Sequence, residues 1–101
     1  MITRLVKLDL SHDKAEKFKE IFDHYKEKIK AQEGCHHVEL LQDKNDPSLF
    51  FTHSVWESEE HLNLYRKSEL FGEVWPKTKT FFTNKAEAWS LNKISTAKDQ
   101  Q

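Results

Sequence analysis

Apolar and polar residues alternate along the first ten positions, a period of two that predicts a half-buried β-strand. One face of this strand carries Ile2, Arg4, Val6, Leu8 and Leu10. From Asp13 the period changes, and apolar residues recur every three or four positions, as on one side of a helix. That stripe contains Phe18, Phe22, Tyr25 and Ile29. We expect the helix to end at Gly34, because glycine commonly follows a helix C-terminus.

The middle of the chain returns to extended patterns. Residues 35–42 predict a second strand, and the run from Asp43 to Pro47 predicts a turn because it concentrates turn-forming residues. Residues 49–56 are rich in aromatic and β-branched side chains, which predicts the clearest strand of the chain. This strand places Phe50 and Trp56 on one face and Leu49, Phe51 and Val55 on the other. Both of its faces therefore carry apolar side chains.

A second helix is expected after Ser58, whose hydroxyl is suited to capping a helix N-terminus. Another apolar segment follows and reaches Pro76. Because proline has no amide proton, we expect a kink there, or a restart with Pro76 in the first turn of a piece that runs through Phe81. Residues 86–91 predict a fourth strand, and residues 92–101 form a polar tail.

These elements follow the order β-α-β-β-α-β of the ferredoxin-like α+β plait, in which helices cover one face of an antiparallel sheet. We therefore predict one domain over residues 1–91. The face without helices should be polar at every second residue, yet apolar side chains are expected on both faces. The outward candidates are Leu5, Leu49, Phe51 and Val55, with either Trp89 or the pair Ala86 and Ala88. We expect a second copy to cover them, which gives a homodimer through the open sheet face.

The composition narrows the class of protein. The chain has 101 residues, and its 33% charged residues nearly cancel to a net charge of −1, so we expect no nucleic-acid partner. Its apolar runs are short, and neither a membrane span nor a signal peptide is expected. Cys35 is the single cysteine, which favours a reducing compartment and a cytoplasmic location.

A family resemblance is carried by two runs, VWESEEHL at residues 55–62 and YRKSELF at residues 65–71. They resemble the antibiotic biosynthesis monooxygenase family, and Gly34-Cys35 and Asp46-Pro47 are also similar. The resemblance extends over residues 1–91. It implies a dimeric α+β barrel with a pocket between sheet and helices in each protomer. It also implies oxidation of aromatic, quinol-like compounds by O₂ without a cofactor, haem degradation, or action on small carbonyl compounds.

The chain departs from the residues that characterised relatives use. Thr52, Ser54 and Tyr65 stand where many relatives carry Asn, Glu and His. Trp75 and Val6 stand where the haem-degrading relatives carry a proximal His and an Asn. An indole cannot ligate iron as an imidazole does, so we do not expect haem degradation.

Two residues are the candidate catalytic groups. His53 is the candidate base, because a neutral imidazole within an apolar strand can accept a proton from a bound phenol or quinol. The alternative is a packed histidine or one at the dimer interface, and a one-residue slip of register decides between the two faces. Tyr65 is expected to donate a hydrogen bond to a substrate oxygen, a role that Thr52 can share.

The remaining substrate-binding candidates are one cation and an aromatic group. Arg4 lies on an apolar face and needs a partner: an anionic or carbonyl group of a ligand, a carboxylate such as Glu73, or solvent at the strand end. Trp56, Phe71 and Trp75 are expected to form flat walls for an aromatic ligand. For Trp56 the alternative is plain core packing.

Six histidines in so short a chain raise the question of a metal. Cys35 and His37 are two residues apart on one strand, and His53 lies on the next. A zinc site needs three or four convergent ligands, and here the convergence depends on the hairpin register. Without a spacing motif we expect no metal and no cofactor.

The sequence therefore favours a cofactor-independent monooxygenase that acts on a small aromatic or quinol-like compound. A non-catalytic dimeric protein that binds a small ligand is the alternative from another class. A third possibility is an isomerase or metabolite-processing enzyme for a small carbonyl compound.

Overall fold

A computed structural model describes residues 1–98, and these form four strands, three α-helices and one short 3₁₀ helix. The elements are β1 (Ile2–Asp9), η1 (His12–Lys14), α1 (Ala15–Lys30), β2 (Cys35–Gln42), β3 (Leu49–Trp56), α2 (Glu59–Arg66), α3 (Glu69–Lys79) and β4 (Glu87–Leu91). The predicted α+β plait is confirmed, with two helices between β3 and β4 instead of one. Residues 92–98 are neither helix nor strand, and residues 99–101 of the predicted tail lie outside the described part.

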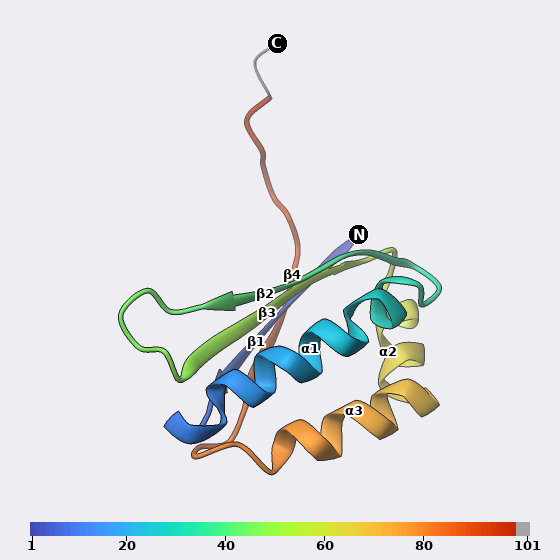
Figure 1. Ribbon diagram of the computed structural model, residues 1–101. Helices are drawn as coiled ribbons and strands as arrows, with labels where there is room; N and C mark the ends of the chain where they lie inside the picture. The colour runs from blue at the N-terminus through green and yellow to red at the C-terminus, as the bar shows by residue number, and fades with distance from the viewer. Residues whose placement is uncertain (99–101) are drawn as a thin grey trace.

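The four strands form one antiparallel sheet in the order β2-β3-β1-β4. The central strand β1 pairs with both neighbours, so Val6 lies between Thr52 of β3 and Ala88 of β4. All three helices lie on the same side of the sheet (Figure 1), and no helix or strand of residues 1–98 covers the other side. The sheet therefore has one covered and one open face.

The hydrophobic core lies on the covered face, in two clusters. The larger joins Leu8 and Phe50 of the sheet to Phe18 of α1, and the rings of Phe18 and Phe50 meet edge to face at 5.3 Å between centroids. The smaller surrounds Trp56, which is 1% exposed and contacts Leu62 of α2. The even-numbered positions of β1 and β3 supply these side chains, as the alternation predicts.

The connection from α1 to β2 differs from the prediction in two ways. The helix ends at Lys30, four residues before Gly34, which instead has φ of +82° in the turn leading into β2. A β-carbon at Gly34 would collide with the His61 ring as well as strain the backbone, so glycine is required there. A β-bulge then shifts the register between Cys35 and His37. Cys35 is therefore buried beside Trp56, and Cys35 and His37 do not share the strand face that was predicted for them.

The restart expected at Pro76 is wrong, because α3 is one helix from Glu69 to Lys79 with the proline inside it. The Ser68 hydroxyl accepts the amide proton of Phe71 at 3.1 Å and caps this helix. Beyond the proline, the Thr78 hydroxyl donates to the Val74 carbonyl at 2.6 Å, which ties the two turns together. Pro76 itself cannot donate to the carbonyl four residues earlier, so the helix tolerates one missing backbone hydrogen bond at this position.

Within residues 1–98, no helix combines the length and apolar character needed to cross a bilayer. The cytoplasmic location expected from the single cysteine stays a prediction.

Candidate functional site

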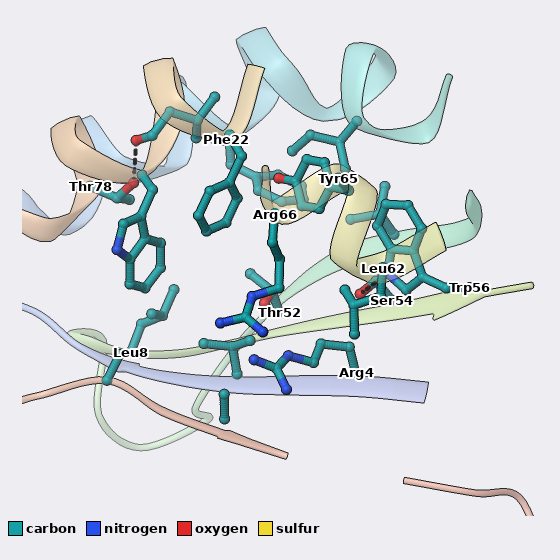
Figure 2. A pocket seen from close by; sticks show the side chains of 18 of the residues that line it. Arg4, Leu8, Phe22, Thr52, Ser54, Trp56, Leu62, Tyr65, Arg66 and Thr78 are labelled. Carbon is teal, nitrogen blue, oxygen red and sulfur yellow. Dashed lines mark hydrogen bonds between the residues drawn. The ribbon is translucent and has the colours of Figure 1, made fainter. Parts of the chain in front are cut away.

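A pocket of about 320 Å³ lies between the covered face of the sheet and the helices (Figure 2). Its floor comes from β1, β3 and β4, where small or polar side chains leave space between the two core clusters. The side chains of that floor include Arg4, Val6, Thr52, Ser54, Ala86 and Ala88. The helices supply the roof, with Phe22, Tyr65, Arg66, Phe71, Val74 and Trp75. On β3 the short polar residues Thr52 and Ser54 lie between the bulky residues Phe50 and Trp56, and this difference in size leaves room for the pocket.

Aromatic rings form one continuous wall of this pocket. Trp56 and Tyr65 stack with their centroids 5.0 Å apart, and Tyr65 meets Phe71 edge to face at 5.3 Å. Phe71 in turn stacks on Trp75, with an interplanar angle of 9° and a centroid distance of 5.7 Å. Trp56 is both wall and core, since its indole nitrogen donates to the buried Ser54 hydroxyl at 3.0 Å. Flat rings at these angles suit a flat, apolar ligand.

Two arginines bring positive charge to this apolar pocket. Arg4 projects from the sheet and Arg66 from the end of α2, and both guanidinium groups point into the space between the layers (Figure 2). Arg4 donates to the Ser90 hydroxyl at 3.0 Å. Within residues 1–98 neither guanidinium forms an ion pair with a carboxylate, so the alternative pairing of Arg4 with Glu73 is not present.

Burial and neighbouring groups shift the pKa values of Arg4 and Tyr65. Burial, followed by the charge of Arg66, lowers the pKa of the Arg4 guanidinium, which nevertheless keeps its proton as arginine does in proteins. Burial, with a smaller contribution from Cys35, raises the pKa of Tyr65 to about 12. Tyr65 is therefore a neutral hydroxyl at neutral pH, able to donate to a ligand but unable to serve as a base.

The described residues that line the pocket include no histidine, aspartate, glutamate or cysteine. Its polar side-chain groups are the two guanidinium groups, the hydroxyls of Thr52, Ser54, Tyr65 and Thr78, and the indole N–H groups of Trp56 and Trp75. Such a set can hold an anion, orient an oxygen atom and exclude water. It offers no side chain that accepts a proton near neutral pH.

The predicted position of His53 in the pocket is wrong. In β3 the side chains of Thr52 and Trp56 point to the helices, and the period of two sends His53 to the open face. There its Nδ1 lies 2.6 Å from a carboxylate oxygen of Glu39 on β2. Hydrogen bonds from His53 and then from His37 hold the pKa of the Glu39 carboxyl below its usual range. His53 therefore cannot touch a ligand in this pocket.

The other six predicted site residues all line the pocket: Arg4, Thr52, Trp56, Tyr65, Phe71 and Trp75. The sequence reasoning missed Arg66. The signal was present, because Arg66 follows Leu62 by four positions, and residues four apart share one face of a helix. Since Leu62 is an apolar residue that packs towards the sheet, Arg66 was bound to lie on the same side.

The fold and the site together define a class: a ferredoxin-like α+β domain with a ligand pocket between its sheet and its helices. A family model described as antibiotic biosynthesis monooxygenase matches residues 1–75. The chain belongs to the antibiotic biosynthesis monooxygenase family.

Solved structures agree with this assignment at the level of the fold. A protein described as antibiotic biosynthesis monooxygenase superimposes with a TM-score of 0.88 at 15% identity, covering 94% of this chain and 100% of that chain. A conserved protein from Methanosarcina mazei gives 0.86 at 21% identity, with 93% and 94% covered. A protein from Pseudomonas aeruginosa gives 0.82 at 19% identity, with the same coverage. No significant match was found among curated proteins.

Proposed function

We propose that this chain binds a small aromatic, quinol-like compound as its anion and oxidises it with O₂ without a cofactor. The observation that carries the proposal is the pair Arg4 and Arg66, whose guanidinium groups meet in a pocket walled by stacked aromatic rings. An aromatic ring can pack against this wall, and an oxygen anion on that ring suits the two guanidinium groups. The family name is consistent with oxidation.

In this proposal the two arginines promote deprotonation of the substrate, the role that was predicted from the sequence for the base His53. An opposite charge within about 4–6 Å favours the ionised form of an acid, so a phenol held beside two guanidinium groups loses its proton to water more readily. The resulting phenolate is electron-rich and can donate an electron to O₂. In this proposal Tyr65 and Thr52, which both line the pocket, donate hydrogen bonds to a substrate oxygen.

The electrons balance without an external reductant. A hydroquinone and one O₂ give a hydroxyquinone and one water. One oxygen atom enters the ring, the other leaves as water, and the substrate supplies all four electrons. If the reaction stops after two electrons, the products are the quinone and hydrogen peroxide, so measuring peroxide separates the two outcomes.

A second copy of the chain covering the open sheet face is part of this proposal. The apolar residues left uncovered on that face include Leu41, Trp89 and Leu91, which are 43%, 42% and 44% exposed. Trp89 extends the row formed by Leu5 and His53, since β1 pairs Leu5 with both. An apolar area that spans several strands is typical of a surface that associates.

A non-catalytic protein that binds the same ligands is the second candidate. It is favoured by one observation, the absence of a proton-accepting side chain among the described residues that line the pocket. Both candidates use the two arginines and the aromatic walls. They differ only in turnover.

Oxygen uptake with a panel of hydroquinones tests the proposal, with quenching of tryptophan fluorescence as a parallel measure of binding. We expect Arg4→Gln to lower kcat/KM at least about tenfold, because a lost charge-assisted hydrogen bond costs about 1.5–3 kcal/mol. Lys67→Gln is the matched control: it removes the same charge at an exposed position directly after Arg66 and outside the pocket. Its rate should equal that of the wild type.

The outcomes separate the two candidates. Saturable quenching that Arg4→Gln weakens, without oxygen uptake for any compound, selects the binding protein. Equal uptake by wild type and Arg4→Gln overturns the proposed role of the pocket. The absence of both quenching and uptake across the panel overturns both candidates.

A further inference from the structure

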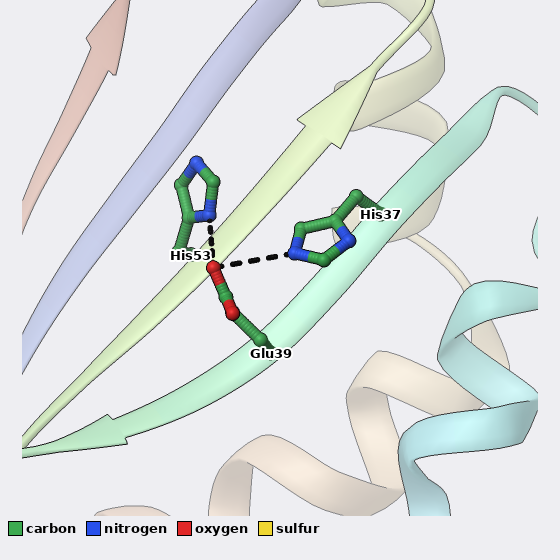
Figure 3. A group of neighbouring side chains, drawn as sticks. All are labelled: His37, Glu39 and His53. Atoms are coloured by element: carbon green, nitrogen blue, oxygen red, sulfur yellow. Dashed lines mark hydrogen bonds and ion pairs between the residues drawn. The ribbon is translucent and has the colours of Figure 1, made fainter. Parts of the chain in front are cut away.

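Three side chains with metal-binding atoms converge on the open face of the sheet, away from the pocket. His37 and Glu39 are two residues apart on β2, so they point to the same side. The register of the hairpin pairs Glu39 with His53 of β3, which brings the second imidazole beside the carboxylate. Figure 3 shows the Glu39 carboxylate lying between the two rings.

The β-bulge at the start of β2 determines this convergence. It shifts the register between Cys35 and His37, so that Cys35 is buried under the helices while His37 lies on the open face. Without the shift, the period of two would place both on one side. The bulge thus selects a set of two imidazoles and a carboxylate, with no thiol.

The distances within this set are short. The nearest Glu39 oxygen is 2.6 Å from His53 Nδ1 and 3.2 Å from His37 Nε2. One ligand atom from each residue lies within 4.8 Å of the other two. The ring centroids of His37 and His53 are 5.4 Å apart. In a single chain the side chains are 48%, 41% and 30% exposed in the order His37, Glu39, His53, so an ion can reach them before a second copy covers the face.

We propose that His37, Glu39 and His53 form a binding site for a divalent transition metal ion of the Zn²⁺ type. Two imidazole nitrogens and one carboxylate oxygen are ligands that this ion accepts, with a fourth position left for water or another group. Metal–ligand bonds of about 2.0–2.2 Å in a tetrahedron separate neighbouring ligands by about 3.2–3.6 Å. The ligand atoms of the three side chains already lie within 4.8 Å of one another, close to that spacing.

Other histidines of the chain are engaged elsewhere. His36 contacts the Glu57 carboxylate, and His61 Nδ1 lies 2.7 Å from the Ser58 hydroxyl that caps α2. Among residues 1–98, the triad on β2 and β3 is the one group of three such side chains in range of a common ion. The ion would lie on the opposite side of the sheet from Arg4 and Arg66, so its ligands are not part of the pocket. It would lie on the face that a second copy of the chain is proposed to cover, and therefore at that interface.

Calorimetric titration with ZnCl₂ tests the site, using the tag-free chain after treatment with a chelator. We expect one ion per chain, and at least tenfold weaker binding for Glu39→Gln and for His53→Ala. His12→Ala is the matched control, because it removes an exposed histidine far along the chain from the triad and should leave the affinity unchanged. Urea unfolding of each variant identifies any that fails to fold, and the isosteric Glu39→Gln keeps the shape of the site.

Cobalt provides a second, independent readout. With CoCl₂ we expect the visible bands of a four-coordinate Co²⁺ ion and no thiolate-to-metal charge-transfer band. A charge-transfer band would assign the ion to Cys35 and overturn the proposal. So would equal zinc affinities of the wild type, Glu39→Gln and His53→Ala, or the absence of zinc binding by the wild type.

Discussion

The two faces of the sheet are built from the same strands and differ in what completes them. On the covered face, Phe50 and Trp56 are each 1% exposed, because α1 and α2 pack against them. On the open face, Leu41 and Trp89 keep 43% and 42% of their surface exposed. The covered face forms the hydrophobic core and the pocket. The open face also carries large apolar side chains, but no helix of residues 1–98 packs against them. Folding therefore covers one face with helices and leaves apolar side chains of the other uncovered within residues 1–98.

The two faces also place their polar groups differently. The covered face brings two like charges, Arg4 and Arg66, to the pocket without a carboxylate partner among the described residues. The open face holds His37, Glu39 and His53 in contact with one another. Unpaired like charges suit an anionic ligand, and a mutually bonded set suits a cation that replaces its protons.

The largest expected effect comes from the covered face. Phe50→Ala should lower the free energy of unfolding by about 3–5 kcal/mol, because it removes a fully buried ring that contacts Phe18. Urea unfolding measures it. Phe51→Ala, the next residue on the open face, is the matched control and should cost less in dilute solution. An equal, concentration-independent cost for Phe51→Ala would show that the open face is as much a core of the single chain as the covered one.

A smaller effect is expected from the edge of the open face. Sedimentation of the wild type should give a dimer at micromolar concentration, and Trp89→Lys should shift it towards monomer. Burying one such side chain contributes about 1.5–3 kcal/mol in each protomer, and a buried lysine opposes it. Leu64→Lys is the control: Leu64 is 61% exposed on α2, on the helix side, and should leave the dimer intact. A monomeric wild type would contradict the idea that the open face associates.

The sequence predicts the fold well because alternation is a local signal. The even positions of β1 and β3 carry Leu8, Phe50 and Trp56, which fall on one face whatever the partner strand. That same signal contradicts the prediction for His53. Thr52 and Trp56 cannot share a face with a side chain at an odd position of the same strand. The error came from weighing the chemistry of the residue above its place in the strand.

Other features depend on non-local geometry and could not be predicted. The bulge between Cys35 and His37 leaves no mark in residue type, since it follows from how β2 meets β3. The continuity of α3 through Pro76 is not visible in residue type, since proline usually ends or kinks a helix and only the packing of the whole segment decides otherwise. Arg66 is a different case, because its spacing of four from the apolar Leu62 was a local signal that places both on one face of α2.

The smallest expected effect tests whether the pocket beside Tyr65 is dry. At neutral pH, Tyr65→Phe should change the free energy of unfolding by no more than about 0.5 kcal/mol, because no hydrogen bond of its hydroxyl is lost within residues 1–98.

In alkaline solution the stabilities of the wild type and Tyr65→Phe should differ. The pKa of Tyr65 is raised from 10.0 to about 12, so the folded wild type keeps a proton that the unfolded chain loses above pH 10. Its stability must therefore fall as the pH rises from about 10 towards 12, and Tyr65→Phe lacks this component. Difference absorbance of tyrosinate, wild type minus Tyr65→Phe, should place the missing step near pH 12. A step near pH 10 with the chain still folded would show that water reaches this side of the pocket, and the contrast between a dry covered face and an exposed open face would not extend to the pocket.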